Sequence, residues 1–260
     1  ASPQSYGFCR LDMRSLTYFL KQTPKIADPL LRGAARMALM EEFLHEAMPP
    51  ATLLESILEA LPAEQEPLNR QQLLDQLQTI YWRFADSELR LSSKAKIEEL
   101  LWDLLLSAKD ASARLTYFSA YQSMAETWPA VQRLNRLWNK SLSITGLTLS
   151  ESQRIDLACA IALRWPQRAD SILTQQLAEI TNPDRKQRLN FIRPVFAADQ
   201  AQRDAFFNSL KKEENRDYEP WVEDALGYLN HPRRPNAEKL HYVLPALELL
   251  EEIQRTGDIF

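Results

Sequence analysis

Apolar residues recur at intervals of three and four positions through most of this 260-residue chain. The pattern is clearest after Pro67, where the apolar positions fall on one face of an ideal α-helix. Those positions are Leu73, Leu74, Leu77, Ile80, Tyr81 and Phe84. A half-buried strand would alternate apolar and polar residues instead, so this spacing predicts a series of amphipathic α-helices.

Prolines and short polar side chains mark where these helices begin and end. Asp12 precedes the first helical stretch, and Asp28 stands directly before Pro29, which is typical of a cap followed by the first helical position. In all, the pattern predicts about thirteen helices. They are expected at 13–22, 29–47, 52–61, after Pro67, from Ser92 or Ser93, at 111–127, from Pro129, from Ser150 or Ser152 to Trp165, from Pro166, from Thr181 or Asn182, at 202–212, from Pro220, and in a last helix with Pro245 early in it and Gly257 as its stop.

Consecutive helices of this kind must pair, because a single amphipathic helix cannot bury its apolar stripe. The helix pairs recur about every 35 to 45 residues, within the range of HEAT and armadillo units. We therefore expect an all-α, HEAT/armadillo-like, irregular right-handed α-superhelix over residues 13–260. The preceding segment SYGFCRLD is β-leaning, so residues 1–12 are expected to be the tail of an upstream β domain. The loop at 143–150 is the best candidate hinge.

Composition supports helices and excludes some functions. Only five glycines occur, and glycine is the residue that turns between strands require. The net charge of −4 argues against a nucleic-acid surface, which would carry a basic excess. No apolar run approaches the length of about 18 residues that a membrane-spanning helix needs.

No motif for catalysis or metal binding stands out. A zinc metallopeptidase helix carries histidines at i and i+4, but His45 and Glu46 run into Pro49 at the position of the second histidine. His231 and His241 lie far away, and neither a G-x-S-x-G nor a phosphate-binding glycine loop is present. Cys159 is expected to be a small buried apolar residue. We expect no catalytic residue and no metal ligand in this chain.

A basic cluster is the one candidate binding feature. Arg185, Lys186, Arg188 and Arg193 are expected on one helix. One interpretation is a solvated face that pairs with nearby carboxylates such as Asp184. The other is a basic wall that attracts a carboxylate ligand, because the arginine fork matches a carboxylate with two hydrogen bonds.

Several stretches resemble the C-terminal helical domain of bacterial zinc aminopeptidases of the aminopeptidase N type. The segment NPDRKQRLNFIRPVF, with EPWVEDALGYLNHP and LPALELLEEIQRTGDIF, is similar to the last third of that domain. DPLLRGAARMALMEEFL resembles its second helix, YWRF a recurrent segment, and SYGFCRLD the strand that closes the preceding β-sandwich domain. The resemblance spans nearly the whole chain and is most specific over its last 80 residues, about 181–260.

The resemblance implies a non-catalytic part of an enzyme. In that family the zinc, its ligands and the general base lie in upstream domains, while the helical domain walls the substrate chamber and gates peptide access. The implied partners are the upstream catalytic and β-sandwich domains and the peptide substrates. Arg185, Arg188 and Arg193 are then candidates for binding the substrate's distal carboxylate. A bacterial cytoplasmic or periplasmic location stays open.

A different class of function is a standalone helical-repeat scaffold that binds a protein partner on its concave face. Such scaffolds need polar terminal caps. The strand-like start and the apolar Ile259 and Phe260 at the end disfavour this alternative. An unrecognised hydrolase lacks any catalytic constellation.

Overall fold

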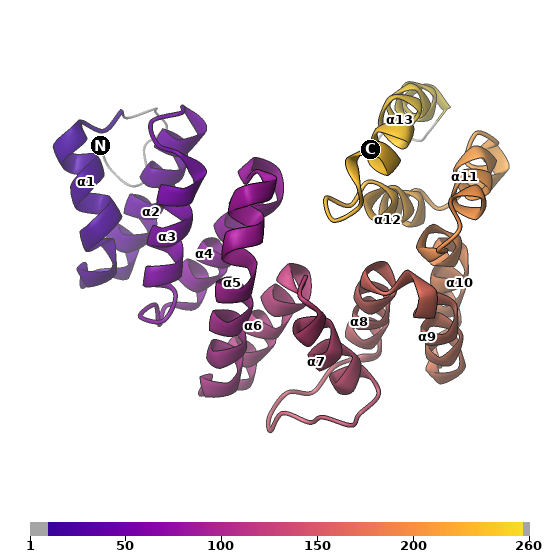
Figure 1. Cartoon of the computed structure of the whole chain (residues 1–260), viewed down its shortest axis with the longest axis horizontal. Coiled ribbons are helices and arrows are strands. Elements are labelled where there is room, and N and C mark those ends of the chain that lie inside the picture. Colours follow the sequence, from indigo (N-terminus) through magenta and orange to yellow (C-terminus); the bar gives the residue numbers. More distant parts are fainter. Residues whose placement is uncertain (1–9, 257–260) are drawn as a thin grey trace. The chain divides into compact units, whose positions relative to one another are not determined.

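A computed structural model describes residues 10–256, and that range contains thirteen α-helices and no strand (Figure 1). The all-α expectation is confirmed. The first seven helices are α1 (Met13–Gln22), α2 (Pro29–Leu44), α3 (Pro50–Ala60), α4 (Pro67–Thr79), α5 (Ser87–Ser107), α6 (Ala111–Met124) and α7 (Trp128–Trp138). The others are α8 (Glu151–Arg164), α9 (Pro166–Glu179), α10 (Pro183–Ile192), α11 (Gln200–Ser209), α12 (Glu219–Leu229) and α13 (Asn236–Thr256). Short turns η1 (Thr23–Lys25), η2 (Ile80–Phe84), η3 (Arg193–Phe196) and η4 (Glu213–Asn215) connect some of them.

The helix starts follow from side-chain caps that the sequence indicates. Asp12 accepts the backbone N–H of Ser15 at 2.8 Å, and Asn182 accepts that of Arg185 at 3.0 Å. Ser150 and Gln153 form a reciprocal capping box at the start of α8. Each cap satisfies a backbone donor that the first turn leaves without a helical partner. The loop expected at 143–150 lies between α7 and α8, as predicted.

Some boundaries differ from the expectation. Helix α5 begins at Ser87, because Asp86 caps it by accepting from Leu89 N–H at 2.8 Å. Ser92 and Ser93 lie inside α5, where their hydroxyls donate back to helix carbonyls, so the predicted start there is wrong. Helix α2 ends at Leu44, before the predicted end at residue 47.

The last third of the chain also departs from the expectation in places. Helix α11 begins at Gln200 because Asp199 caps it. Pro245 lies in the middle of α13 rather than near its start. Gly257 and residues 5–9 of the strand-like segment lie outside the described residues, and residues 10–12 have no regular structure.

The YWRF segment forms a wider turn than an α-helix. Residues Ile80–Phe84 are π-helical, and Ala85 N–H donates to the Ile80 carbonyl at 2.8 Å, five residues back. The rings of Tyr81 and Trp82 pack edge to face there, with centroids 4.9 Å apart. This turn closes α4 and carries the buried Tyr81 into the core.

The chain divides into two compact units. The first unit contains the described residues up to Ala130 together with Ile144–Thr148, and the second contains Val131–Ser143 and the described residues from Leu149 onward. The boundary falls inside α7. The right-handed superhelical arrangement stays a prediction.

The first unit is a stack of neighbouring helices. Helix α2 packs on α1, α3 and α4, and α6 packs on α4 and α5. Gly33 permits the close approach of α2 to α4, because a Cβ there would lie 2.6 Å from the Asn69 side-chain oxygen. Its fully buried side chains include Leu39, Leu53, Ile57, Leu77, Ile97 and Tyr121.

The second unit is built in the same manner. Helix α8 packs on α9, and α10 contacts both α9 and α12. Its fully buried side chains include Leu134, Leu157, Ile161, Leu189, Ile192 and Leu229. Helix α13 packs on α12, with Tyr242 and Leu249 buried. No helix among residues 10–256 combines the length and apolar character needed to cross a bilayer.

Candidate functional site

The predicted substrate-binding arginines lie on α10 and directly after it, in the second unit. Arg185, in the first turn, pairs with Glu151 at the start of α8, with Nη1 3.0 Å from Oε1. Glu151 also accepts the backbone N–H and the hydroxyl of Thr181, at 2.8 and 2.7 Å. The Thr181 bonds, followed by Arg185, lower the pKa of Glu151 from 4.5 to about 2. Arg185 is therefore one of several donors on this carboxylate.

Arg188 is the most enclosed of the three. Its Nε donates to Asp224 on α12 at 2.6 Å, and its Nη1 lies 3.6 Å from Asp156 on α8. Burial raises the pKa of Asp156, which Arg188 partly opposes. Cys159, one turn further along α8, is a buried free thiol whose pKa burial raises to about 12. Arg188 thus joins three helices of the second unit.

Arg193 is the first residue of η3. Its Nη2 donates to the Asp170 carboxylate and, at 2.7 Å, to the hydroxyl of Thr174, both on α9. The Asp170 side chain is 86% exposed, so this pair is open to solvent.

The structure does not bring the three arginines to one pocket. Each contacts carboxylates of other helices: α8 for Arg185, α8 and α12 for Arg188, and α9 for Arg193. Sequence reasoning expected a neighbour such as Asp184 and missed these acids, because they lie 23 or more residues away along the chain. The carboxylate-binding role stays a prediction.

The described histidines lie apart from one another. His45 directly follows the last residue of α2, the His231 Nδ1 accepts from the backbone N–H of Arg233 at 3.1 Å, and His241 Nε2 lies 3.6 Å from Asp204. Within residues 10–256, no three His, Cys, Asp or Glu side chains are grouped so that they could hold a metal ion.

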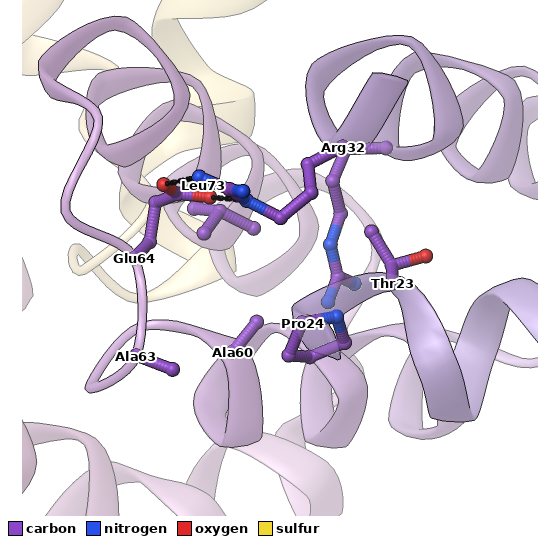
Figure 2. Close-up of a pocket in the computed structure, with 8 residues that line it drawn as sticks. Thr23, Pro24, Arg32, Ala60, Ala63, Glu64 and Leu73 are labelled. Carbon is purple, nitrogen blue, oxygen red and sulfur yellow. Dashed lines mark hydrogen bonds and ion pairs between the residues drawn. The ribbon is translucent and has the colours of Figure 1, made fainter. Parts of the chain in front are cut away.

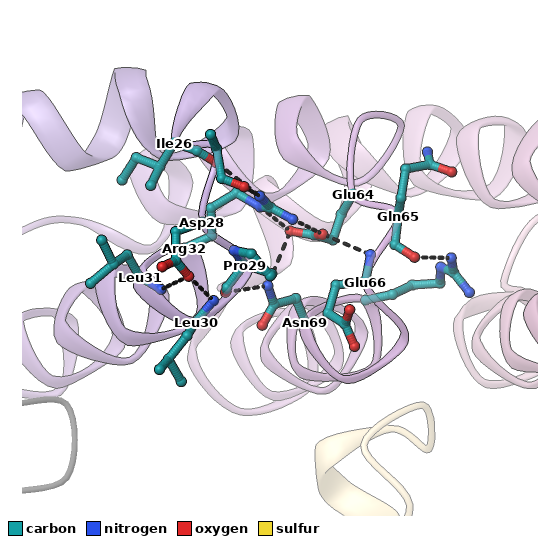
Figure 3. Close-up of polar contacts among 12 residues, drawn as sticks. Ile26, Asp28, Pro29, Leu30, Leu31, Arg32, Glu64, Gln65, Glu66 and Asn69 are labelled. Atoms are coloured by element: carbon teal, nitrogen blue, oxygen red, sulfur yellow. Dashed lines mark hydrogen bonds and ion pairs between the residues drawn. The ribbon is translucent and has the colours of Figure 1, made fainter.

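A second polar centre, which sequence reasoning missed, lies in the first unit. Arg32 of α2 binds Glu64 through two hydrogen bonds, Nε to Oε2 at 2.9 Å and Nη2 to Oε1 at 2.7 Å (Figure 3). Arg32 Nη1 also donates to the carbonyls of Ile26 and Ala27. Burial raises the pKa of Glu64, but the bonds from Arg32 and from Glu66 N–H outweigh it, so the pKa lies below its ordinary value. The pair fixes the turn before α4 against the start of α2.

A small cavity adjoins this pair and is partly open to solvent (Figure 2). Its volume is about 10 Å³, the space that one water molecule occupies. It is lined by Thr23, Pro24, Arg32, Arg36, Ala60, Ala63, Glu64 and Leu73. Arg36 is buried, and its Nη1 donates to the Ser56 hydroxyl at 2.9 Å. Burial lowers the pKa of Arg36 to about 10.

The sequence offers one weak signal for this second centre. Arg32 and Arg36 are spaced four residues apart on a helix otherwise rich in small and apolar residues, which places both on one side. Glu64, 32 residues from Arg32, has no local feature that marks it as the partner.

Comparison with known proteins adds no relative. No family model matches the chain, and no curated protein matches it.

Proposed function

We propose that this chain is the C-terminal helical domain of a zinc-dependent aminopeptidase of the aminopeptidase N type. In this proposal it is non-catalytic, walls the substrate chamber and gates the access of peptides to an upstream active site. The proposal rests mainly on the resemblance of residues 182–260 to the last third of that domain. The all-α fold is compatible with it, because the resembling stretches fall on α10, α12 and α13.

The upstream catalytic domain would supply the zinc and the chemistry, and an upstream β-sandwich domain would join it to this chain. The arginines would bind the distal carboxylate of a peptide. Arg193 is the best placed of the three, because its partner Asp170 is largely in water and can be released at little cost. Arg188, held by two carboxylates, is the least available.

A reconstitution tests the chamber role. The catalytic portion of the parent polypeptide is expressed alone, this chain is added in trans, and hydrolysis of an aminoacyl reporter and of longer peptides is followed. We expect this chain to bind and to change the peptide-length profile, because a chamber wall limits entry by size. Absence of binding, or binding that leaves every substrate unaffected, would contradict the proposal.

The arginine contribution is tested in the same assay. Arg193→Gln is expected to raise KM for peptides more than for the reporter, which has no distal carboxylate. Arg168→Gln is the matched control, because Arg168 is also exposed but contacts Ser171 and Trp165 within α9 and its cap. Equal effects of the two substitutions would remove Arg193 from substrate binding.

One observation favours a second candidate, a scaffold that binds a protein partner. The outward side of α13 exposes a row of apolar residues, with Leu240, Leu244 and Leu247 each more than half exposed. Exposed apolar rows of this kind occur at protein interaction sites. This alternative would be favoured if the chain has no effect in the reconstitution, but binds a partner protein and no longer binds it after the substitution Leu244→Glu.

A further inference from the structure

Arg36 is a buried cation whose hydrogen bonds in the described part of the chain all go to neutral groups. The residue is only 3% exposed. Its Nη1 donates to the Ser56 hydroxyl at 2.9 Å, and its Nη2 donates to the Ser56 carbonyl at the longer distance of 3.4 Å. No carboxylate among the described residues forms an ion pair with it. Glu64 and Glu59 act on it only through space. A guanidinium has five N–H donors, so three of them have no protein acceptor in the described part of the chain.

The cavity beside Arg36 carries an excess of positive charge. Two guanidinium groups, of Arg32 and Arg36, and one carboxylate, of Glu64, line it, so the lining side chains carry one net positive charge. The carboxylates of Asp28, Glu59 and Glu66 act on these arginines from outside the lining. The Glu64 oxygens are already engaged by Arg32 and by Glu66 N–H. A buried charge is costly unless it is paired. The cavity therefore favours a guest that is negative and accepts hydrogen bonds.

We propose that this cavity is a binding site for a small monovalent anion of the halide class, held by Arg36. The ion accepts hydrogen bonds from guanidinium N–H groups that protein acceptors leave free, and it supplies the missing counter-charge. The apolar side of the cavity comes from Pro24, Ala60 and Leu73, which strengthens the electrostatic contact because they exclude water.

The dimensions select the class of anion. A cavity of about 10 Å³ holds one water-sized particle, so a phosphate, a sulfate or a peptide carboxylate is too large. Chloride is larger than water, so it would extend from the cavity into its partly open side, which also gives it an entry path. The excess positive charge disfavours a cation. This site is independent of the chamber role, because its lining residues belong to the first unit, whereas Arg185, Arg188 and Arg193 belong to the second.

Thermal unfolding of the full 260-residue chain tests the site. Sodium gluconate is replaced stepwise by sodium chloride, and in parallel by sodium bromide, at constant ionic strength. A ligand that binds only the folded state raises the midpoint by mass action, so we expect a rise of about 3 °C at roughly tenfold the dissociation constant, and above that a further rise with the logarithm of the halide concentration. Crystals soaked in bromide should show an anomalous peak within hydrogen-bond distance of Arg36.

Two variants and one control tie the effect to the cavity. Arg36→Gln removes the charge and Ala63→Leu fills the cavity while keeping Arg36, so each should abolish the halide dependence. If the first fails to fold, the second still decides. Arg234→Gln is the control, because Arg234 is also a buried arginine but has the carboxylate of Glu238 at 3.8 Å. The unfolding midpoint of this variant should depend on halide as that of the unmodified chain does.

Three results would overturn the proposal. The first is a midpoint that stays the same when chloride or bromide replaces gluconate at constant ionic strength. The second is a halide dependence that survives both Arg36→Gln and Ala63→Leu. The third is a bromide peak in crystals with no midpoint change in solution, which would indicate an adventitious ion only. None of these results bears on the reconstitution with a catalytic portion, so the two proposals fail separately.

Discussion

The Arg32–Glu64 pair of the first unit and the pairs of Arg185, Arg188 and Arg193 in the second lie in different surroundings. In the first unit, Arg32 and Glu64 form a bidentate pair whose side chains are 15% and 6% exposed. In the second unit, the pairs of Arg185 and Arg193 bridge helices at the surface, with Asp170 almost fully in water. Arg188 is intermediate at 25% exposed. Identical side-chain chemistry therefore spans a range from interior to solvent.

This gradient predicts how much each contact stabilises the fold. Exposed pairs contribute little, because water screens them and because long side chains lose freedom when they are held. Breaking a buried pair leaves a charge without a partner in a poorly solvated place, and that is costly. Hydrogen-bond geometry alone would give the Arg188 and Arg32 contacts a similar contribution to stability, whereas their different burial predicts a larger contribution from Arg32. Four measurements test this ranking.

Glu64→Gln should have the largest effect. It leaves the partly buried Arg32 and the buried Arg36 with no carboxylate between them, so the free energy of unfolding should fall by about 3 kcal/mol. Urea unfolding followed by circular dichroism measures it. Glu179→Gln is the matched control, because Glu179 pairs with Arg154 and Lys140 at the surface. Equal losses for the two substitutions would contradict the role of burial.

Arg188→Gln should have an intermediate effect. It leaves Asp156 and Asp224 close together without the cation that both contact, and the free energy of unfolding should fall by about 1.5 kcal/mol. The same urea experiment applies. Adding Asp224→Asn to the variant should recover part of the loss, because it removes one of the two unpaired charges. A double variant that is less stable than Arg188→Gln would rule out this explanation.

Arg193→Gln should cost little, about 0.5 kcal/mol, because its partner is exposed. The loss should shrink further in high salt, which screens surface charges. Urea midpoints at low and high sodium chloride check this. A loss of stability that is independent of salt and larger than that of Arg188→Gln would contradict the ranking by burial.

Glu151→Gln should produce an effect that is distinguished by its pH dependence. The folded-state pKa of Glu151 lies below its ordinary value, so its ionised form stabilises the fold above pH 4.5. That contribution is lost as pH falls from about 4.5 to about 2. The midpoint difference between parent and variant should therefore be present at neutral pH and shrink over that window. A difference that is constant with pH would contradict the contact with Thr181 and Arg185.

The sequence predicts local features of this protein well. Asp12, Asp28, Ser150 and Asn182 cap helices as expected, because a cap depends on residues within one turn. Where the expectation failed, at Ser92 and Ser93, a hydroxyl suited to a cap donates instead to a carbonyl within the helix. The choice between these two roles depends on Asp86, which precedes both serines along the chain and caps the helix before they are reached.

The partners within the polar centres could not be predicted from neighbouring residues in the sequence. The partners of Arg32, Arg188 and Arg193 lie 19 to 36 positions away, and several acids compete at every such separation. Only the packing of helices selects Glu64 for Arg32 and Asp224 for Arg188. Arg185, Arg188 and Arg193 were identified as a basic cluster from sequence, but their different degrees of exposure follow from tertiary structure alone.

The route of the chain between units limits how this protein can be divided into fragments. The path leaves the first unit within α7, returns to it at Ile144–Thr148 and leaves again. Gly146 lies in that returning segment with φ of +77°, and a side chain there would collide with Arg114 of α6. A cut before the segment takes it from the first unit, and a cut after it leaves Val131–Ser143 on the wrong fragment. No single expression boundary therefore yields both units whole.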